Sequence, residues 1–149
     1  MSTNDDQVVI SLRKVVADSY ALMGQTHLCH WNVRGPSFFS LHQAFEEQYT
    51  ELFTAIDDIA ERVRALGALA PGGLANLAAL AGTAELKEDA SAAEMVKHLC
   101  DLNRNLVADL HTAREQAGDA GDNQTEDLMI ARLQVHEKTL WMLDSFLEG

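Results

Sequence analysis

Helical periodicity is the feature that most restricts the fold of this chain, because hydrophobic residues recur every three or four positions in four long segments. The segments cover residues 8–33, 36–67, 91–116 and 124–146, and glycine, proline or short polar runs separate them. No segment of any length alternates between apolar and polar residues as a half-buried strand does. The sequence therefore predicts an all-α protein built on a four-helix bundle.

The connections between the predicted helices are short, long and short in chain order. The long middle connection contains a run that predicts a short helix near residues 74–80. A bundle with one such crossover has the ferritin-like arrangement, and 149 residues with 47% hydrophobic content suffice for one core. We expect one ferritin-like domain over residues 1–149, with a short helix in the crossover between helices 2 and 3.

Local signals mark the helix ends and one buried stripe. Gly35 and Pro36 separate the first helix from the second, and Ser91 with Glu94 forms a capping-box pattern at the start of the third. Along the first helix, the residues at inward spacing are Leu12, Val16, Ser19, Met23, Thr26 and His30. His30 is therefore predicted to face the bundle.

Acidic residues outnumber basic ones by 23 to 11, which gives a formal net charge of −12 with neutral histidines. Such a surface repels phosphate backbones and anionic membranes, and it attracts cations. No apolar run approaches the roughly 18 residues of a membrane span, and no secretory signal is recognisable. Cys29 and Cys100 fit no disulfide framework or zinc motif. We expect a cytoplasmic protein with idle thiols and no membrane partner.

The second helix has three faces when residues are placed at 100° intervals. The apolar face, which is predicted to lie in the core, holds Leu41, Phe45, Tyr49, Leu52, Ile56, Ile59, Val63 and Leu66. A second face has the composition of a partly buried polar seam and holds His42, Glu46, Phe53, Asp57, Ala60 and Glu61. A third, which charged residues would usually expose to water, holds Glu47, Glu51 and Asp58.

The ligand-type residues of the second face cannot all bind one ion in one chain. His42 and Asp57 are fifteen residues apart, which is roughly 22 Å along a helix. Two copies of the helix, antiparallel about a two-fold axis near residues 50–52, bring His42 of one chain opposite Asp57 and Glu61 of the other. A helical hairpin at the Gly-Pro turn places His30 beside His42. The hypothesis is two identical sites per dimer, each built by both chains.

The predicted metal ligands are His30, His42, Asp57 and Glu61, with Glu46 one turn beyond His42. Mixed imidazole and carboxylate ligands suit iron(II), zinc or manganese, and the lack of thiolate ligands argues against a closed structural zinc site. Carboxylates stabilise iron(III) as it forms, so the pattern favours a ferroxidase. No Glu-x-x-His pair occurs, which disfavours a di-iron centre inside one subunit. The alternative is a polar seam that only fixes the geometry of a dimer.

The residues of this predicted site resemble those of the Dps family, the mini-ferritins also called DNA-binding proteins from starved cells. The matching motifs are the run His30-Trp31-Asn32-Val33-x-Gly35, then His42, Glu46, and the run IDDIAER with Asp57 and Glu61. The likeness covers most of the chain, including the crossover and the ending EDLMIAR...LWMLDSFL. The family often has an aspartate where Glu46 stands.

This resemblance implies a hollow dodecamer that oxidises iron(II), preferably with hydrogen peroxide, and stores iron(III) mineral as protection against oxidative stress. It implies inter-subunit ferroxidase sites with two iron ions at most, each formed by one chain's histidines and the partner's Asp57 and Glu61. Trp31 matches a tryptophan beside the centre that takes up electrons or radicals. Its plainer interpretation is aromatic packing between helices.

Two acidic sets have both a role in the family and a plainer interpretation. The first set is Asp119, Asp122 and Asp127. In the family this region lines a three-fold pore, whereas the plainer interpretation is a helix cap and charges that favour the positive end of a helix. The other either faces water or lines the cavity and nucleates mineral, and consists of Glu47, Glu51 and Asp58. No partners are predicted for His27, His98, His111 and His136.

The chain departs from the family name at its ends. DNA binding in such cages usually depends on a lysine-rich tail, whereas the ends here read MSTNDDQ and FLEG. Direct binding to duplex DNA is therefore expected to be weak at physiological salt. Removal of iron(II) together with peroxide protects DNA without contact. An architectural nucleoid protein is the competing function, and the missing basic tail weighs against it.

Overall fold

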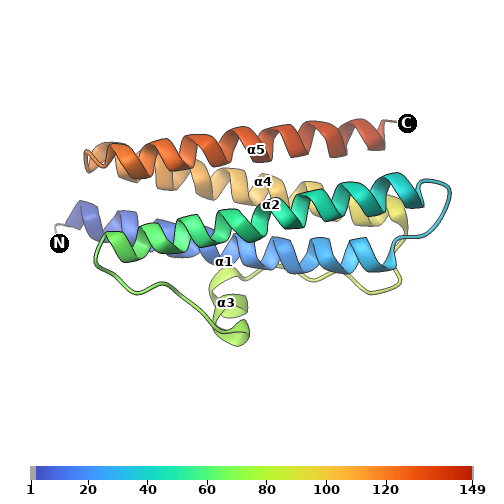
Figure 1. Ribbon diagram of the computed structural model, residues 1–149, viewed down its shortest axis with the longest axis horizontal. Helices are drawn as coiled ribbons and strands as arrows, with labels where there is room; N and C mark the ends of the chain where they lie inside the picture. The colour runs from blue at the N-terminus through green and yellow to red at the C-terminus, as the bar shows by residue number, and fades with distance from the viewer. Residues whose placement is uncertain (1–2, 149) are drawn as a thin grey trace.

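The computed structural model describes residues 3–148 and contains helices and loops, with no strand in that range. The helices are α1 (Thr3–Asn32), α2 (Phe38–Ala65), α3 (Leu74–Ala81), α4 (Ala92–Asp119) and α5 (Asn123–Leu147). Figure 1 shows the four long helices side by side in an elongated bundle, with α3 outside it against α1. The predicted all-α, ferritin-like bundle with a short helix in the crossover is confirmed.

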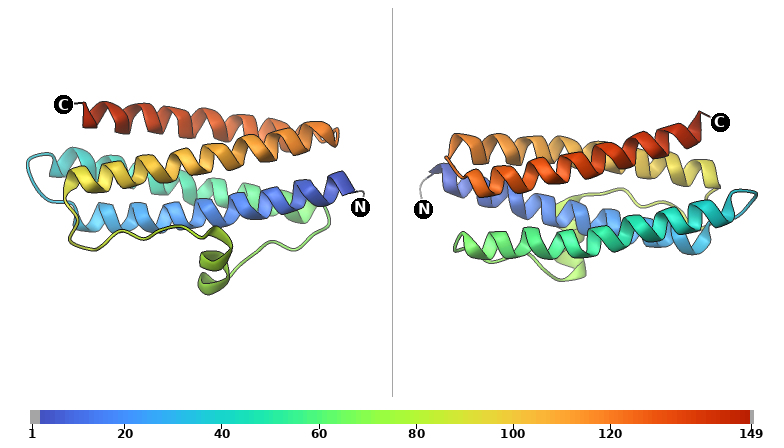
Figure 2. Two further views of the ribbon diagram at one scale, coloured as in Figure 1. Left: turned by 180° about the vertical axis from the view of Figure 1, so that it is seen from behind. Right: turned by 45° about the horizontal axis from the view of Figure 1, so that its top comes forward.

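The four long helices do not pack equally on all sides. α1 packs along α2 and along α4, and α4 packs along α5, whereas α2 and α5 meet at few points. The two views in Figure 2 show the bundle from behind and with its top tilted toward the viewer. A groove of about 470 Å³ lies between α2 and α5 as a result. Among the helices of residues 3–148, none contains an apolar stretch of the length that a transmembrane span requires.

The buried faces of α1 and α2 are those that the sequence predicts. All six residues of the predicted α1 stripe are buried, including the polar Ser19, Thr26 and His30. The Thr26 hydroxyl donates to the Leu22 carbonyl oxygen at 2.7 Å, so its burial leaves no hydrogen bond unmade. On α2 the predicted core residues are buried too, except Tyr49 and Leu66, which are half-buried against the core.

Capping and burial explain where the helices begin. The predicted capping box of α4 is confirmed, because Ser91 Oγ accepts from the Glu94 amide at 3.1 Å and Glu94 Oε1 accepts from the Ser91 amide at 3.2 Å. Gly35 has a φ of 107°, which lets the chain reverse between α1 and α2. α1 begins at Thr3, before its predicted start at Val8, because acidic residues in the first turn favour the positive helix end.

α4 continues to Asp119, past its predicted end at Gln116, because its last turn packs on α5. Ala117 is fully buried there. A Cβ atom at Gly118 would lie 2.8 Å from Glu126 Oε2 of α5. The glycine that predicts a helix stop instead marks a close approach between two helices.

The crossover between α2 and α4 is held along the first helix by hydrogen bonds to its backbone. Side chains of α1 and of the turn after it make these bonds: Arg13 to the Leu69 oxygen, Lys14 to the Ala81 oxygen (3.1 Å), Gln25 to the Leu86 amide (2.8 Å) and Arg34 to the Asp89 oxygen (2.9 Å). Leu77 of α3 adds an apolar contact and is buried. The crossover is therefore a fixed part of the subunit.

Candidate metal centre

His30 at the end of α1 and His42 in the first turns of α2 lie face to face across the Gly35 turn. Their ring centroids are 3.8 Å apart and their planes differ by 13°. Each Nδ1 lies 2.7 Å from the backbone carbonyl oxygen of the other histidine. A carbonyl only accepts, so each Nδ1 carries the proton and donates it, and each Nε2 keeps a lone pair. Such a bond at the far nitrogen is the usual way in which metal-binding histidines are oriented.

The surroundings fix both rings. His30 is buried at 6% exposure, and the ring of Tyr49 meets it edge-on with centroids 5.2 Å apart. Phe38 stacks on the ring of His42 with centroids 4.9 Å apart. Glu46 Oε1 lies 3.9 Å from His30 Nε2, which brings a carboxylate near the free nitrogen. The chain thus places the predicted ligands His30 and His42 in contact, with the predicted ligand Glu46 near His30.

His27 is a neighbour of this pair for which the sequence predicts no partner. It lies parallel to the Trp31 ring with centroids 5.1 Å apart and meets the Tyr49 ring at 4.1 Å. Burial, and then the electrostatic influence of His30, lower the pKa of His27. Trp31 itself is 68% exposed. The sequence signal that places His27 near the histidine pair is its spacing of about one helical turn from His30.

Asp57 and Glu61, the other predicted ligands, are exposed on α2. Fifteen residues of helix, roughly 22 Å, separate Asp57 from His42. In the described part of the chain, no three His, Cys, Asp or Glu side chains are grouped so that they can hold a metal ion. Phe53 lies between the two sets on α2 and is 68% exposed. One chain alone therefore does not bring all the predicted ligands together.

The acidic residues near the start of α5 differ in their surroundings. Asp122 is the N-cap of α5, where its Oδ1 accepts from the Thr125 amide at 3.1 Å and from Arg62 at 2.9 Å. The helix-cap interpretation is therefore confirmed for Asp122, whose carboxylate is already engaged. Asp119 and Asp127 are exposed.

On the third face of α2, one of the three acidic residues forms an ion pair with another helix. Glu51 pairs with the Arg132 guanidinium on α5, and Arg132 is only 6% exposed. Glu47 and Asp58 are exposed, as charged residues of such a face usually are. His136 and Asn103 extend the Glu51 pair into the interior, a cluster that the sequence does not predict.

The bundle, with imidazole and carboxylate side chains along α2, defines a ferritin-like protein. The family model described as a ferritin-like domain matches residues 11–149. A relative from Brevibacillus brevis, named DNA protection during starvation protein, is 42% identical over 152 residues, which cover 99% of this chain and all of the relative.

Comparison with solved structures identifies the family to which this ferritin-like chain belongs. The crystal structure of a Dps protein from Bacillus brevis matches with a TM-score of 0.95 and 39% identity, over 99% of both chains. A Dps protein from Vibrio cholerae O1, described as a member of a broad superfamily of ferritin-like diiron-carboxylate proteins, matches with a TM-score of 0.93 and 30% identity over 97% of this chain and 91% of that one. The chain belongs to the Dps family, as its motifs indicate.

Proposed function

We propose that this protein is an iron-storing ferroxidase that assembles into a hollow dodecamer and protects the cell against oxidative stress. Iron(II) is its substrate, hydrogen peroxide its preferred oxidant, and each oxidation site lies between two subunits and takes two iron ions at most. The relatives named for DNA protection and the ferritin-like diiron-carboxylate neighbour support iron chemistry of this kind.

The observation that carries the proposal is the pair His30 and His42, each with its Nδ1 proton committed to a carbonyl and its Nε2 lone pair free. Two imidazoles whose Nε2 atoms point away from their hydrogen bonds can bind a metal ion, but the ion then needs further ligands. Asp57 and Glu61 lie exposed on the same helix beyond their reach. Two-fold pairing of α2 with its antiparallel copy supplies them and covers Phe53.

In the proposed reaction, hydrogen peroxide takes one electron from each of two iron(II) ions, and its O–O bond breaks. Two iron(II) ions, one peroxide and two waters give two iron(III) oxyhydroxide units and four protons. The histidines bind iron(II), and the partner's Asp57 and the partner's Glu61 supply the negative charge that favours iron(III). Glu46 adds a ligand beside His30. Trp31 donates one electron when the oxidant needs an odd number of electrons and the two iron(II) ions supply only two.

Exposed acidic residues away from the oxidation site bind iron(II) on its way in and iron(III) after oxidation. Asp119 and Asp127 are exposed and lead iron(II) through a three-fold pore. Glu47 and Asp58, also exposed, nucleate the mineral inside. Asp122 and Glu51 have weaker claims to these roles, because Arg62 and Arg132 already neutralise them.

The first experiment loads the protein with iron(II) under anaerobic conditions, adds stoichiometric peroxide, and follows the absorbance of iron(III). Wild type is expected to oxidise iron rapidly into a soluble product, and His30→Ala/His42→Ala is expected to lose this activity while staying assembled. His111→Ala is the matched control, since His111 is half-exposed on α4, a helix that contributes no ligand to the proposed oxidation site. If wild type oxidises iron no faster than buffer, the proposed function is wrong.

Subunit mixing tests whether the site is shared. His30→Ala/His42→Ala and Asp57→Ala/Glu61→Ala are each expected to be inactive alone. In a mixed dimer, one site has lost both histidines and both Asp57 and Glu61, while the other has intact histidines from one chain and intact Asp57 and Glu61 from the other. Random co-assembly is therefore expected to restore about a quarter of the wild-type sites. No recovery in cages that contain both variants excludes an inter-subunit site.

A further inference from the structure

A buried polar cluster joins α2, α4 and α5 inside the subunit. The Arg132 guanidinium donates to both carboxylate oxygens of Glu51 and to Nε2 of His136 at 2.9 Å. His136 Nδ1 donates in turn to Asn103 Oδ1 at 2.9 Å, and the Asn103 amide donates to the Leu99 carbonyl oxygen at 2.8 Å. His136 and Asn103 are each 2% exposed and Arg132 is 6% exposed, whereas the Glu51 side chain, at the outer end of these bonds, is 42% exposed.

The end of the Arg132 side chain stands where a metal ion would find two ligands. Its Nη2 lies 2.9 Å from Glu51 Oε1 and 2.9 Å from His136 Nε2. The bond from His136 Nδ1 to Asn103 turns the Nε2 lone pair toward this point, as in metal-binding histidines. Metal bonds to such atoms are about 2.0–2.2 Å long, so each ligand needs to move by less than about 1 Å to hold an ion there.

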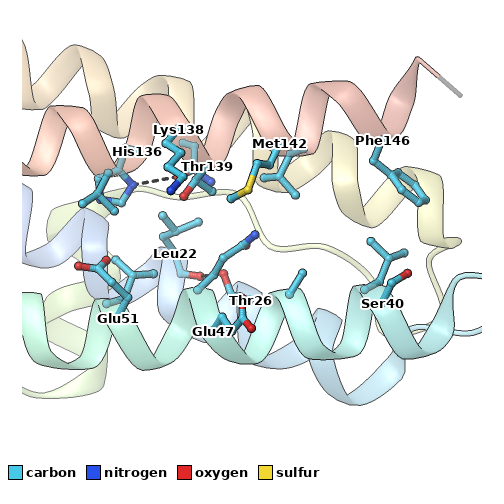
Figure 3. A pocket seen from close by; sticks show the side chains of 17 residues that line it. Leu22, Thr26, Ser40, Glu47, Glu51, His136, Lys138, Thr139, Met142 and Phe146 are labelled. Carbon is cyan, nitrogen blue, oxygen red and sulfur yellow. Dashed lines mark hydrogen bonds between the residues drawn. The ribbon is translucent and has the colours of Figure 1, made fainter.

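Ions have access to this point from the groove between α2 and α5. Figure 3 shows Glu51 and Glu47 on one wall of the groove and His136 on the other, and all three residues line it. Burial, and then the charge of Arg132, lower the pKa of His136 to about 3, so the imidazole stays neutral and does not repel a cation. The guanidinium occupies the position that an ion bound by these two groups would take.

We propose that Arg132 is a specificity-determining residue, whose guanidinium fills a cation position formed by Glu51 and His136 and so keeps divalent ions out of the subunit interior. An arginine is suited to this role, because it stays protonated at any physiological pH and its fork matches a carboxylate. The consequence rests on the proposed function: iron is oxidised at the subunit interface and not inside the bundle. The blocking of the cation position does not depend on oxidation.

Zinc binding to the full-length, assembled protein tests this inference without redox chemistry. Arg132→Ala is expected to bind one more zinc ion per chain than wild type. Zinc at a hundredfold excess over its Kd is expected to raise the Tm of this variant by roughly 5 to 10 °C more than that of wild type. If Arg132→Ala assembles only when it is refolded with zinc, the result also supports the inference, because zinc then replaces the guanidinium at the cation position. Equal zinc binding by wild type and variant, or a variant that zinc does not rescue, overturns the inference.

Two further variants separate a specific site from general loosening of the bundle. Arg132→Lys keeps a cation beside Glu51 and is expected to bind no extra zinc. Arg132→Ala/His136→Ala lacks the imidazole and is expected to lose the extra ion. An extra zinc ion that appears in either variant contradicts the assigned position. Because zinc is not oxidised, a wild type without ferroxidase activity refutes the proposed function and leaves this result unaffected.

Discussion

Substitution of Asp18 by asparagine is expected to stabilise the protein at neutral and alkaline pH. Asp18 on α1 is 9% exposed, and its Oδ2 has no hydrogen-bond partner among the described residues. Lys14 Nζ lies 2.6 Å from Asp18 Oδ1 and 3.5 Å from Asp109 Oδ2 of α4, so one ammonium group serves two carboxylates. Burial, and then Asp109, raise the pKa of Asp18 to about 7.

The direction of the effect follows from where the proton is held. The folded protein binds this proton up to about pH 7, whereas the unfolded chain releases it near the ordinary aspartate pKa of 3.8. The free energy of unfolding therefore falls as pH rises through this window and stays low above it. Between pH 5 and pH 8 the loss from this one group is at most about 2 to 3 kcal/mol, or roughly 5 to 10 °C in Tm.

The assay is the Tm of wild type and Asp18→Asn across pH 5 to 8. Asparagine does not titrate, and its amide can donate to Asp109 while its oxygen accepts from Lys14. The difference in Tm between the variant and wild type is expected to grow as pH rises. Asp58→Asn, an exposed aspartate on α2, is the control and should follow wild type. Parallel curves for Asp18→Asn and wild type would refute the reasoning. His98 and Asp101 are titratable residues that line the same pocket as Asp18. Because both residues are present in wild type and in the two variants, a difference in Tm between these proteins does not come from a change at either of them.

Three other predictions concern parts of the chain outside the iron site. Ser91→Ala removes the capping box of α4 and is expected to cost about 1 kcal/mol, seen as a fall of about 2 to 4 °C in Tm; an unchanged Tm contradicts it. Burial raises the pKa of Cys29 to about 12 and that of Cys100 to about 11, so a thiol reagent at pH 8 should modify them only after unfolding, and fast labelling of the folded protein is the opposing result. Duplex DNA should show no shift on a gel at physiological salt, because the formal charge of each chain is −12; a shifted band that persists there contradicts this and favours the nucleoid function.

The features that the sequence predicts are those that depend on one helix or one turn. Periodicity fixes which face of α1 is buried, and His30 lies on that face as expected. The short Gly-Pro turn allows only a hairpin, so the proximity of His30 and His42 follows from chain geometry. The start of α4 is equally local, because Ser91 and Glu94 satisfy each other within one turn.

Features that depend on two distant helices could not be read in this way. Glu51 and Arg132 are 81 residues apart, and their pairing depends on how α2 and α5 are rotated about their axes. The available signals were an asparagine, Asn103, on the apolar stripe of α4 and the four-residue spacing of Arg132 and His136, neither of which identifies a partner. The end of the third helix, predicted at residue 116, is a further example, because α4 continues through Gly118, where a Cβ atom would lie 2.8 Å from Glu126 Oε2 of α5.

The bonds that hold the crossover also determine which mutations it can accept. Every one of them ends on a backbone group of the crossover, at Leu69, Ala81, Leu86 and Asp89, while the side chains come from the N-terminal part of the chain. Substitutions at the exposed positions within residues 67–90 therefore leave the acceptors in place, and they leave the donor in place unless Leu86 becomes proline. An insertion or deletion shifts the bonding groups on one side of it out of register with α1. Natural variation in this segment should consequently be wide in residue type and narrow in length.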